Sequence, residues 1–180
     1  MLREAPVLGF PETKPPIESF RGRLVPKVSP QRRHGVLQLE IGGILRAWAR
    51  GRGDVATEWR FYLIPPRGNW SSLVPDVAYV SYERLPKDAP PEWREKPTIA
   101  PDLAVEILSP DDSQRILEEK IALYLEFGAT AVLIVDPETR SILLVDAART
   151  QARFSERATV TDERFPGLAI DVCALFAAAD

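Results

Sequence analysis

The sequence has very little cysteine, histidine or asparagine, with one residue of each. The single cysteine, Cys173, cannot form a disulfide within the chain, which fits a protein of the reducing cytoplasm. No stretch approaches the roughly 20 apolar residues that a membrane span needs. The first residues, MLREAPVLGFPETKPP, contain no apolar core of signal-peptide length. We therefore expect a cytoplasmic protein without a membrane segment.

A strong excess of charge of either sign is also lacking. The formal net charge is −3 over 180 residues, which argues against an extended basic coat for nucleic acid but allows a local basic patch. A hydrophobic content of 45% fits a soluble globular protein, and the length suffices for a substantial core. We expect one domain over residues 1–180, with an extended proline-rich segment at 1–16.

Apolar residues at helical spacing predict a first long helix. It begins at Ser29 or Pro30 and ends at the GRG of 51–53. The residues that share its apolar side are Leu37, Ile41, Ile44, Leu45 and Trp48. Before this helix, residues 17–28 alternate around Gly22 and predict a bent hairpin or an edge strand.

A second helix is predicted after residue 113. Residues 111–113 (DDS) supply N-cap chemistry, and Gln114 occupies the matching capping-box position if Asp111 is the cap. This helix runs to Phe127 and stops at Gly128. The last residues, FPGLAIDVCALFAAAD, predict a turn, a short strand and a closing helix.

The other apolar runs predict strands separated by turns. The predicted strands are 55–63, 73–82, 102–108, 130–135 and 141–145, and the DPETR that joins the last two is a clear turn signal. Residues 85–97 predict a charged loop, and residues 149–160 a further strand pair. The elements together indicate one α/β or α+β domain.

One carboxylate, Glu106, lies inside the apolar strand sequence PDLAVEILSP, residues 101–110. A run of this composition bounded by prolines predicts a strand covered on both faces. An ionised side chain in such a strand is costly unless it is paired or coordinated. Glu106 therefore either meets a basic partner that merely satisfies it or belongs to a functional site.

Lys120 lies in the middle of an apolar helix face. At about 100° per residue, it falls within the arc of Ile116, Leu117, Leu123, Tyr124 and Phe127. The side chain either extends to an edge of the face or forms a structural ion pair with Glu106. Alternatively, its ammonium group points into a cleft, where it balances charge or orients a reacting water.

Asp76 alternates with apolar neighbours and shares a strand face with Ala78 and Val80. Because Pro75 precedes it, Asp76 is alternatively a residue at the start of the strand whose carboxylate caps a turn. If Asp76 and Glu106 lie on neighbouring strands, the two carboxylates form a site for a hard cation such as Mg²⁺. The cation would activate water and neutralise charge on a phosphodiester, with a nearby lysine stabilising the transition state.

Two further residues are candidates for a supporting role. Asp102 shares a strand face with Glu106 but lies roughly 13 Å away along the strand, so it is a residue of the strand start or the edge of a site. His34, the single histidine, stands at the start of the first helix. It either contacts phosphate or positions water, or it has only a structural role.

These residues match a known pattern. Pro75 and Asp76, followed thirty residues later by Glu106 in an apolar strand, resemble the PD-(D/E)XK nuclease superfamily. The usual lysine two residues after the glutamate is missing, because Leu108 occupies that position. The chain is more closely similar to a bacterial group of restriction-endonuclease-like domains, the Uma-two family. The shared segments are PDLAVEILSP, EEKIALYLEFGA and VLIVDPETRSILLV.

The resemblance assigns roles to particular residues. It implies that the catalytic lysine has moved from the strand to the following helix, where Lys120 stands. It places His34 at the family's histidine position and Glu18 at a frequent acidic position. The implied fold is a restriction-endonuclease-like core, in which helices flank a mixed central sheet.

The implied function is that of a metal-dependent endonuclease that hydrolyses phosphodiester bonds of DNA. Asp76 and Glu106 would hold Mg²⁺ or Mn²⁺, and Lys120 would act on the water or on the developing charge. A homo-oligomer, such as a dimer, is expected where two strands must be cut.

Two alternatives stay open: a catalytically inactive nuclease-fold binding or scaffold module, and a buried Glu106–Lys120 ion pair in a protein of unrelated role. A basic surface on one face beside the carboxylates would favour the nuclease over the scaffold. The candidate arginines are at positions 21, 23, 32, 33, 46, 50 and 52.

Overall fold

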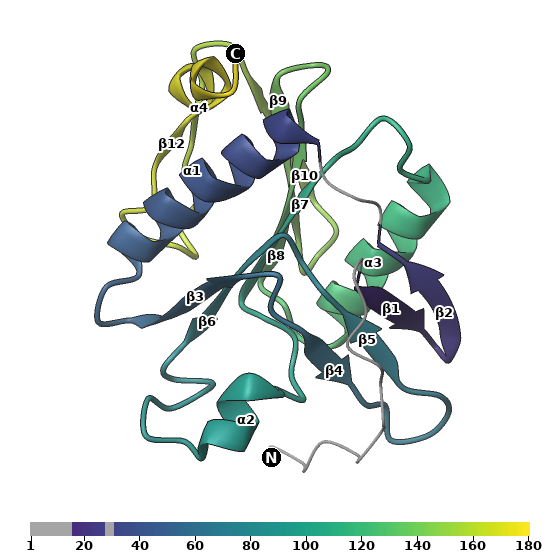
Figure 1. The fold of residues 1–180 in the computed structure, drawn as a ribbon. Helices are drawn as coiled ribbons and strands as arrows, with labels where there is room; N and C mark the ends of the chain where they lie inside the picture. Colours follow the sequence, from purple (N-terminus) through teal and green to yellow (C-terminus); the bar gives the residue numbers. More distant parts are fainter. Residues whose placement is uncertain (1–15, 28–30) are drawn as a thin grey trace.

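The computed structural model of the protein describes residues 16–27 and 31–180 (Figure 1). The first helix, α1, is described as Arg32–Trp48, and its predicted start at Ser29 or Pro30 lies outside the described residues. The extended segment predicted for 1–16 also lies outside them, except for Pro16.

A six-stranded mixed sheet forms the centre of the molecule. Its strand order is β10-β9-β8-β7-β6-β3, and β7 and β8 form the parallel pair, whereas the other neighbours are antiparallel. The strands are β3 (Gly53–Thr57), β6 (Val77–Ser81), β7 (Leu103–Ile107), β8 (Ala131–Asp136), β9 (Ser141–Asp146) and β10 (Gln151–Ser155). Parallel neighbours need a crossover connection, and the helix α3 (Gln114–Glu126) provides it between β7 and β8.

A smaller antiparallel sheet lies beside the large one, with the order β2-β1-β5-β4. Its strands are β1 (Ile17–Phe20), β2 (Arg23–Pro26), β4 (Phe61–Leu63) and β5 (Ser71–Leu73). The hairpin predicted before α1 is therefore confirmed as β1 and β2.

The predictions of single strands over 55–63 and 73–82 are wrong, because each range is divided between the two sheets. Glu58 has a positive φ of 52° between β3 and β4, a backbone conformation that ends regular strand geometry. Pro75 lies between β5 and β6 and has no N–H group to continue a ladder. The chain therefore leaves the large sheet after β3 and returns to it at β6.

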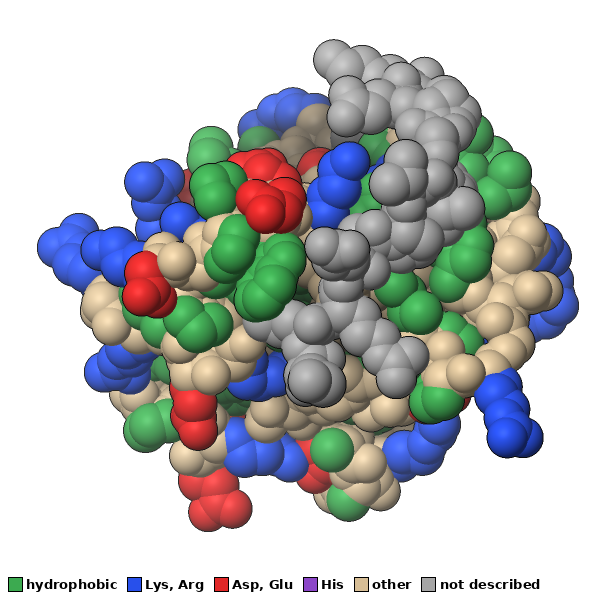
Figure 2. Space-filling model, turned by 90° about the horizontal axis from the view of Figure 1, so that it is seen from below, with side chains coloured by type: hydrophobic (Ala, Val, Ile, Leu, Met, Phe, Trp, Pro, Cys, Tyr) green, Lys and Arg blue, Asp and Glu red, His purple; other side chains and the backbone are tan. Residues whose placement is uncertain are grey.

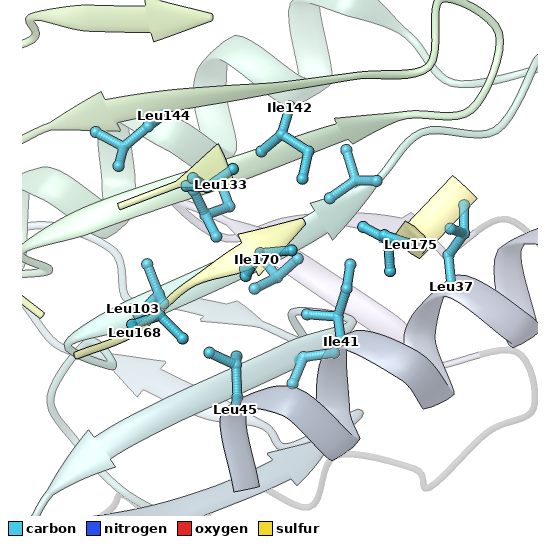
Figure 3. Close-up of a cluster of buried hydrophobic side chains, with 14 of the residues drawn as sticks. Leu37, Ile41, Leu45, Leu103, Leu133, Ile142, Leu144, Leu168, Ile170 and Leu175 are labelled. Atoms are coloured by element: carbon cyan, nitrogen blue, oxygen red, sulfur yellow. The ribbon is translucent and has the colours of Figure 1, made fainter. Parts of the chain in front are cut away.

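Helices cover both faces of the large sheet (Figure 1). On one face, α1 packs together with the C-terminal helix α4 (Val172–Ala178). Figure 3 shows Leu37, Ile41 and Leu45 of α1 directed toward the strands, and all three are fully buried. On the other face, α3 and the smaller sheet enclose a second apolar cluster that includes Phe20, Ala104 and Leu123.

The strand β7 is buried on both faces, as its composition predicted. Leu103, Val105 and Ile107 belong to the core beneath α1, whereas Ala104 belongs to the core beneath α3. Because side chains alternate along a strand, Glu106 points to the α3 side.

The predicted start and end of α3 are both correct, but the capping box suggested at its start is not present. Ser113 is the N-cap and its side chain caps no backbone group, so the proposed Asp111–Gln114 capping box is wrong. Asp112 instead accepts a hydrogen bond from the Ser109 amide at 2.7 Å. At the other end, Gly128 has a φ of 92°, which favours glycine and ends the helix.

Two other connections differ from the predictions. The loop predicted for 85–97 contains a short helix, α2 (Pro91–Glu95), with proline at its first turn, where no amide donor is needed. Residues 149–160 do not pair with one another: β10 pairs with β9, and β11 (Thr159–Val160) pairs with β12 (Ile170–Asp171).

The predicted β8–β9 hairpin and the closing strand and helix are confirmed. Within the described ranges, no helix combines the length and the apolar character that crossing a membrane requires.

Candidate active site

Six ionisable side chains converge near the end of β7 that leads to α3. They come from both sheets and from two helices, and all are largely buried. They are Glu18 of β1, Lys27 after β2, His34 of α1, Asp76 before β6, Glu106 of β7 and Lys120 of α3.

Glu106 and Lys120 form the shortest ion pair of this group. Lys120 Nζ donates to Glu106 Oε2 at 2.6 Å, and Tyr124 Oη donates to Glu106 Oε1 at 2.8 Å. Lys120 and Tyr124 are four residues apart on α3, so they share one helix face. The predicted meeting of the strand carboxylate and the helix lysine is therefore present, and a tyrosine not proposed for the site holds the second oxygen.

Glu18 is the second carboxylate beside Lys120, at 3.2 Å from Oε2 to Nζ. Its other oxygen accepts a hydrogen bond from the amide of Val74 at 2.7 Å. Glu18 therefore ties the smaller sheet to α3 through the lysine, and the structure brings it into the same cluster as Glu106.

Asp76 lies where β6 separates from β7. Its amide donates to the carbonyl of Val105 at 3.0 Å, and its Oδ2 accepts from the amide of Ile107 at 2.6 Å. The carboxylate thus replaces a main-chain acceptor for the residue that follows Glu106. His34 Nε2 lies 3.2 Å from the same oxygen. His34 therefore connects α1 to the cluster through Asp76.

Lys27 was not among the sequence-based candidates. Its Nζ lies 2.7 Å from Asp76 Oδ1, 2.9 Å from Glu58 Oε1 and 3.0 Å from the carbonyl oxygen of Val74. The available signal was a lysine at the end of a short apolar strand, which is too common to indicate a site. Tyr124 had a better signal, since it follows Lys120 by one helical turn.

Asp102 is the candidate that the structure does not bring to this cluster. Its Oδ2 accepts from the amide of Ser81 at 2.7 Å, and its Oδ1 lies 3.4 Å from Arg84. Ser81 is at the far end of β6 from Asp76. Asp102 therefore accepts a main-chain hydrogen bond at the other end of the β6–β7 pair and does not contribute to the site.

The environment separates the two carboxyls in acidity. Burial raises the pKa of Glu106 to about 7, although the Lys120 ammonium acts against the rise. Burial acts in the same direction on Asp76, but the hydrogen bond from His34 and the charge of Lys27 outweigh it and hold its pKa well below the usual value.

The two basic partners remain protonated more readily than usual. Burial lowers the pKa of Lys120, but the Glu106 and Glu18 carboxylates outweigh it and raise the pKa. For His34, the hydrogen bond and charge of Asp76 likewise exceed the effect of burial and raise the pKa.

A hollow of about 230 Å³ opens onto the cluster. Its lining includes Glu18, Lys27, His34, Glu106 and Lys120, together with residues 107–109 and 111–113 of the loop before α3. Asp76 is not part of the lining, although its contacts Lys27 and His34 are. Four of the proposed side chains therefore face a space that a ligand can enter, and Asp76 lies behind them.

The donor set fits a hard divalent cation. Among described residues, no three His, Cys, Asp or Glu side chains gather as a metal site, but Mg²⁺ commonly uses one or two carboxylates and retains water. Asp76 Oδ1 accepts no well-directed hydrogen bond there, and each Glu106 oxygen accepts one, which leaves lone pairs. Asp76 and Glu106 fit Mg²⁺ or Mn²⁺ on the condition that Lys27 leaves Asp76 Oδ1.

The mixed central sheet flanked by helices is that of restriction-endonuclease-like α/β proteins. The chain belongs to the Uma2 family, whose sequence model, described as "Putative restriction endonuclease", matches residues 5–173.

A solved structure is similar over almost the whole chain. It is the crystal structure of "a putative nuclease belonging to DUF820" from Anabaena variabilis ATCC 29413, with 27% identity, 94% of each chain covered and a TM-score of 0.83. No curated protein matches the sequence. The resemblance to the Uma-two family and the fold class expected from it are both confirmed.

Proposed function

We propose that the protein is a metal-dependent endonuclease that hydrolyses phosphodiester bonds of DNA. The observation that carries this proposal is that Glu106 and Lys120 meet at 2.6 Å on the wall of a hollow. A purely structural ion pair would not need Glu18, Asp76, Lys27 and His34 gathered around it. Membership of a family of nuclease-like proteins supports the same class of reaction.

The residues of the cluster have three roles: holding the metal ion, stabilising charge and positioning the carboxylates. Asp76 and Glu106 would hold Mg²⁺ or Mn²⁺, which when bound would supply an activated water and charge neutralisation. Lys120 keeps its positive charge because two carboxylates contact it, and it stabilises negative charge on a phosphate in the hollow. Tyr124 positions Glu106 through its hydrogen bond, and His34 positions Asp76.

A catalytically inactive binding or scaffold module is the second candidate. The observation that favours it is the dispersal of the arginines. Arg21 and Arg23 pair with glutamates of α3, and Arg33 pairs with Asp180 at the C-terminus. These pairs reduce the positive charge that is free to contact DNA.

The deciding experiment is a plasmid nicking assay with purified protein in Mg²⁺ or Mn²⁺. We expect conversion of supercoiled DNA to the nicked or linear form, and its loss in Glu106→Gln and in Lys120→Met. The matched controls are Glu163→Gln and Lys87→Met, which make the same changes at exposed positions.

The result separates the two candidates. If both site variants nick as fast as the wild type, the activity comes from another site or from a contaminant. If the folded wild type binds metal and DNA but does not nick, the scaffold function is correct.

A further inference from the structure

Lys27 occupies a cage of oxygen atoms. Its ammonium contacts the carboxylates of Asp76 and Glu58 and the carbonyl of Val74, at distances of 2.7 to 3.0 Å. The side chain is only 12% exposed. Glu58 is itself held by the Gln38 amide at 2.9 Å, so the cage is built from side chains with defined positions. Such a set of oxygens suits a compact cation.

The ammonium also covers the part of Asp76 that the fold leaves unbound. Asp76 Oδ2 is used by the Ile107 amide and by His34. Asp76 Oδ1 accepts no well-directed hydrogen bond from the described residues and has only the ion pair with Lys27. Lys27 lines the hollow and Asp76 does not, so the residue that pairs with this oxygen is the one that borders the space a ligand can enter.

We propose that Lys27 is an exchangeable internal cation, which neutralises Asp76 in the metal-free protein and must be displaced when a divalent cation binds. The inference rests on the proposed function, because it takes Asp76 as a metal ligand. Lysine suits this exchange, since its charge is carried on a flexible four-carbon chain that can turn toward the hollow. The exchange keeps the buried carboxylate paired at every stage, which avoids the cost of an isolated buried charge.

The exchange lowers metal affinity in a predictable way. A ligand whose site is open for only a fraction of the time binds more weakly by that fraction. If Lys27 occupies the site about nine-tenths of the time or more, the apparent affinity falls by about tenfold or more. Replacement of Lys27 by an uncharged residue of similar length should restore it.

The first test is calorimetric titration of Mn²⁺ into wild type, Lys27→Met and Lys87→Met. We expect Lys27→Met to bind Mn²⁺ at least about tenfold more tightly than wild type, and the exposed control Lys87→Met to match wild type. Equal or weaker binding by folded Lys27→Met overturns the proposal. If wild type and Lys27→Met both fail to bind Mn²⁺, the proposed function fails with it; if both bind equally, only the role of Lys27 fails.

The second test needs no variant and therefore does not depend on how Lys27→Met folds. Lysines of the wild type are acetylated briefly with and without saturating Mn²⁺ and quantified by mass spectrometry. We expect Mn²⁺ to increase labelling of Lys27 severalfold while labelling of Lys87 stays constant. Unchanged or reduced labelling of Lys27 in metal-bound protein contradicts displacement.

Discussion

Glu106 has a donor on each oxygen and almost no contact with solvent, at 5% exposure. Burial makes ionisation of this carboxylate costly, and the Lys120 charge offsets only part of that cost, so its pKa lies near 7 while the nearby Asp76 stays ionised. Two carboxyls of one cluster are therefore set to different acidities by their surroundings. Differences of this kind are common at functional sites.

We predict that the metal-free protein loses stability between pH 5 and pH 8. The folded state binds the Glu106 proton with a pKa of about 7, against 4.5 for an unperturbed group, so protonation favours folding and this contribution is lost as the pH rises toward 7. His34 acts in the same direction, because its raised pKa lets the folded state keep a proton that the unfolded chain loses. Asp76, whose pKa is lowered, is ionised in both states throughout this range.

Urea unfolding in EDTA at the two pH values measures the effect. The raised pKa of Glu106 corresponds to a loss of unfolding free energy on the order of 3 kcal/mol at most. In Glu106→Gln the loss should shrink to the part due to His34, whereas Glu163→Gln should behave like wild type. A wild-type free energy of unfolding that is constant or rises with pH would contradict the assignment.

At the scale of elements, the edge strand β3 illustrates how closely the strands of the large sheet approach one another at the end of β6 away from the site. Gly53 pairs with Ser81 of β6, and a Cβ atom at this position would overlap the carbonyl oxygen of Val80 and the ring of Tyr79. β6 also carries the turn that presents Asp76 to β7. The absence of a side chain at residue 53 thus lets β3 lie close to β6.

We predict opposite effects for two glycine-to-alanine substitutions. Gly53→Ala must displace main-chain atoms of β6 and should destabilise the protein by about 1–3 kcal/mol. Gly43→Ala adds a methyl group on the exposed side of α1, where nothing lies within 4 Å, and should stabilise by about 0.5–1 kcal/mol. Chemical denaturation of both variants beside wild type measures the two changes. Equal denaturation midpoints for Gly53→Ala and wild type would mean that β3 and β6 leave room for a methyl group at residue 53.

At the scale of the whole molecule, positive charge is not collected on one face. Arg21 and Arg23 lie on the β1–β2 hairpin and Arg32 and Arg33 at the start of α1, whereas Arg46, Arg50 and Arg52 lie at its other end. Figure 2 likewise shows lysine and arginine side chains dispersed among acidic and apolar ones on the face it presents. The seven arginines considered from the sequence therefore do not gather at one end of α1.

We predict a shallow salt dependence of DNA binding. Each phosphate contact contributes a slope of about −0.9 to the logarithmic plot of affinity against salt, so about three contacts at the hollow give a slope near −3. Fluorescence anisotropy of a labelled duplex with Glu106→Gln in Mn²⁺, which retains Lys120, measures this slope without cleavage. A slope steeper than about −6 would require an extended basic surface that the fold does not present.

Local sequence patterns alone predicted the centre of the fold and most of the candidate site. The uninterrupted apolar run around Glu106 predicted a strand buried on both faces, and the helical arc around Lys120 predicted a lysine directed inward. Both features can be recognised from neighbouring residues alone, because a charged side chain within a buried apolar segment is costly in any fold unless it is paired. The turn at residues 136–139 and the end of α3 at Gly128 could also be predicted, because their geometry depends on adjacent residues.

No local pattern indicates how distant segments of the chain pair in sheets and form ion pairs, and these features are seen only in the folded protein. The division of 55–63 and 73–82 between two sheets depends on pairing partners that lie elsewhere in the chain. The position of Lys27 between Asp76 and Glu58 follows from that division, because Asp76 stands where the chain returns to the large sheet. Asp102 and Asp76 have similar local sequences, yet they lie at opposite ends of the β6–β7 pair, and strand direction alone separates their roles.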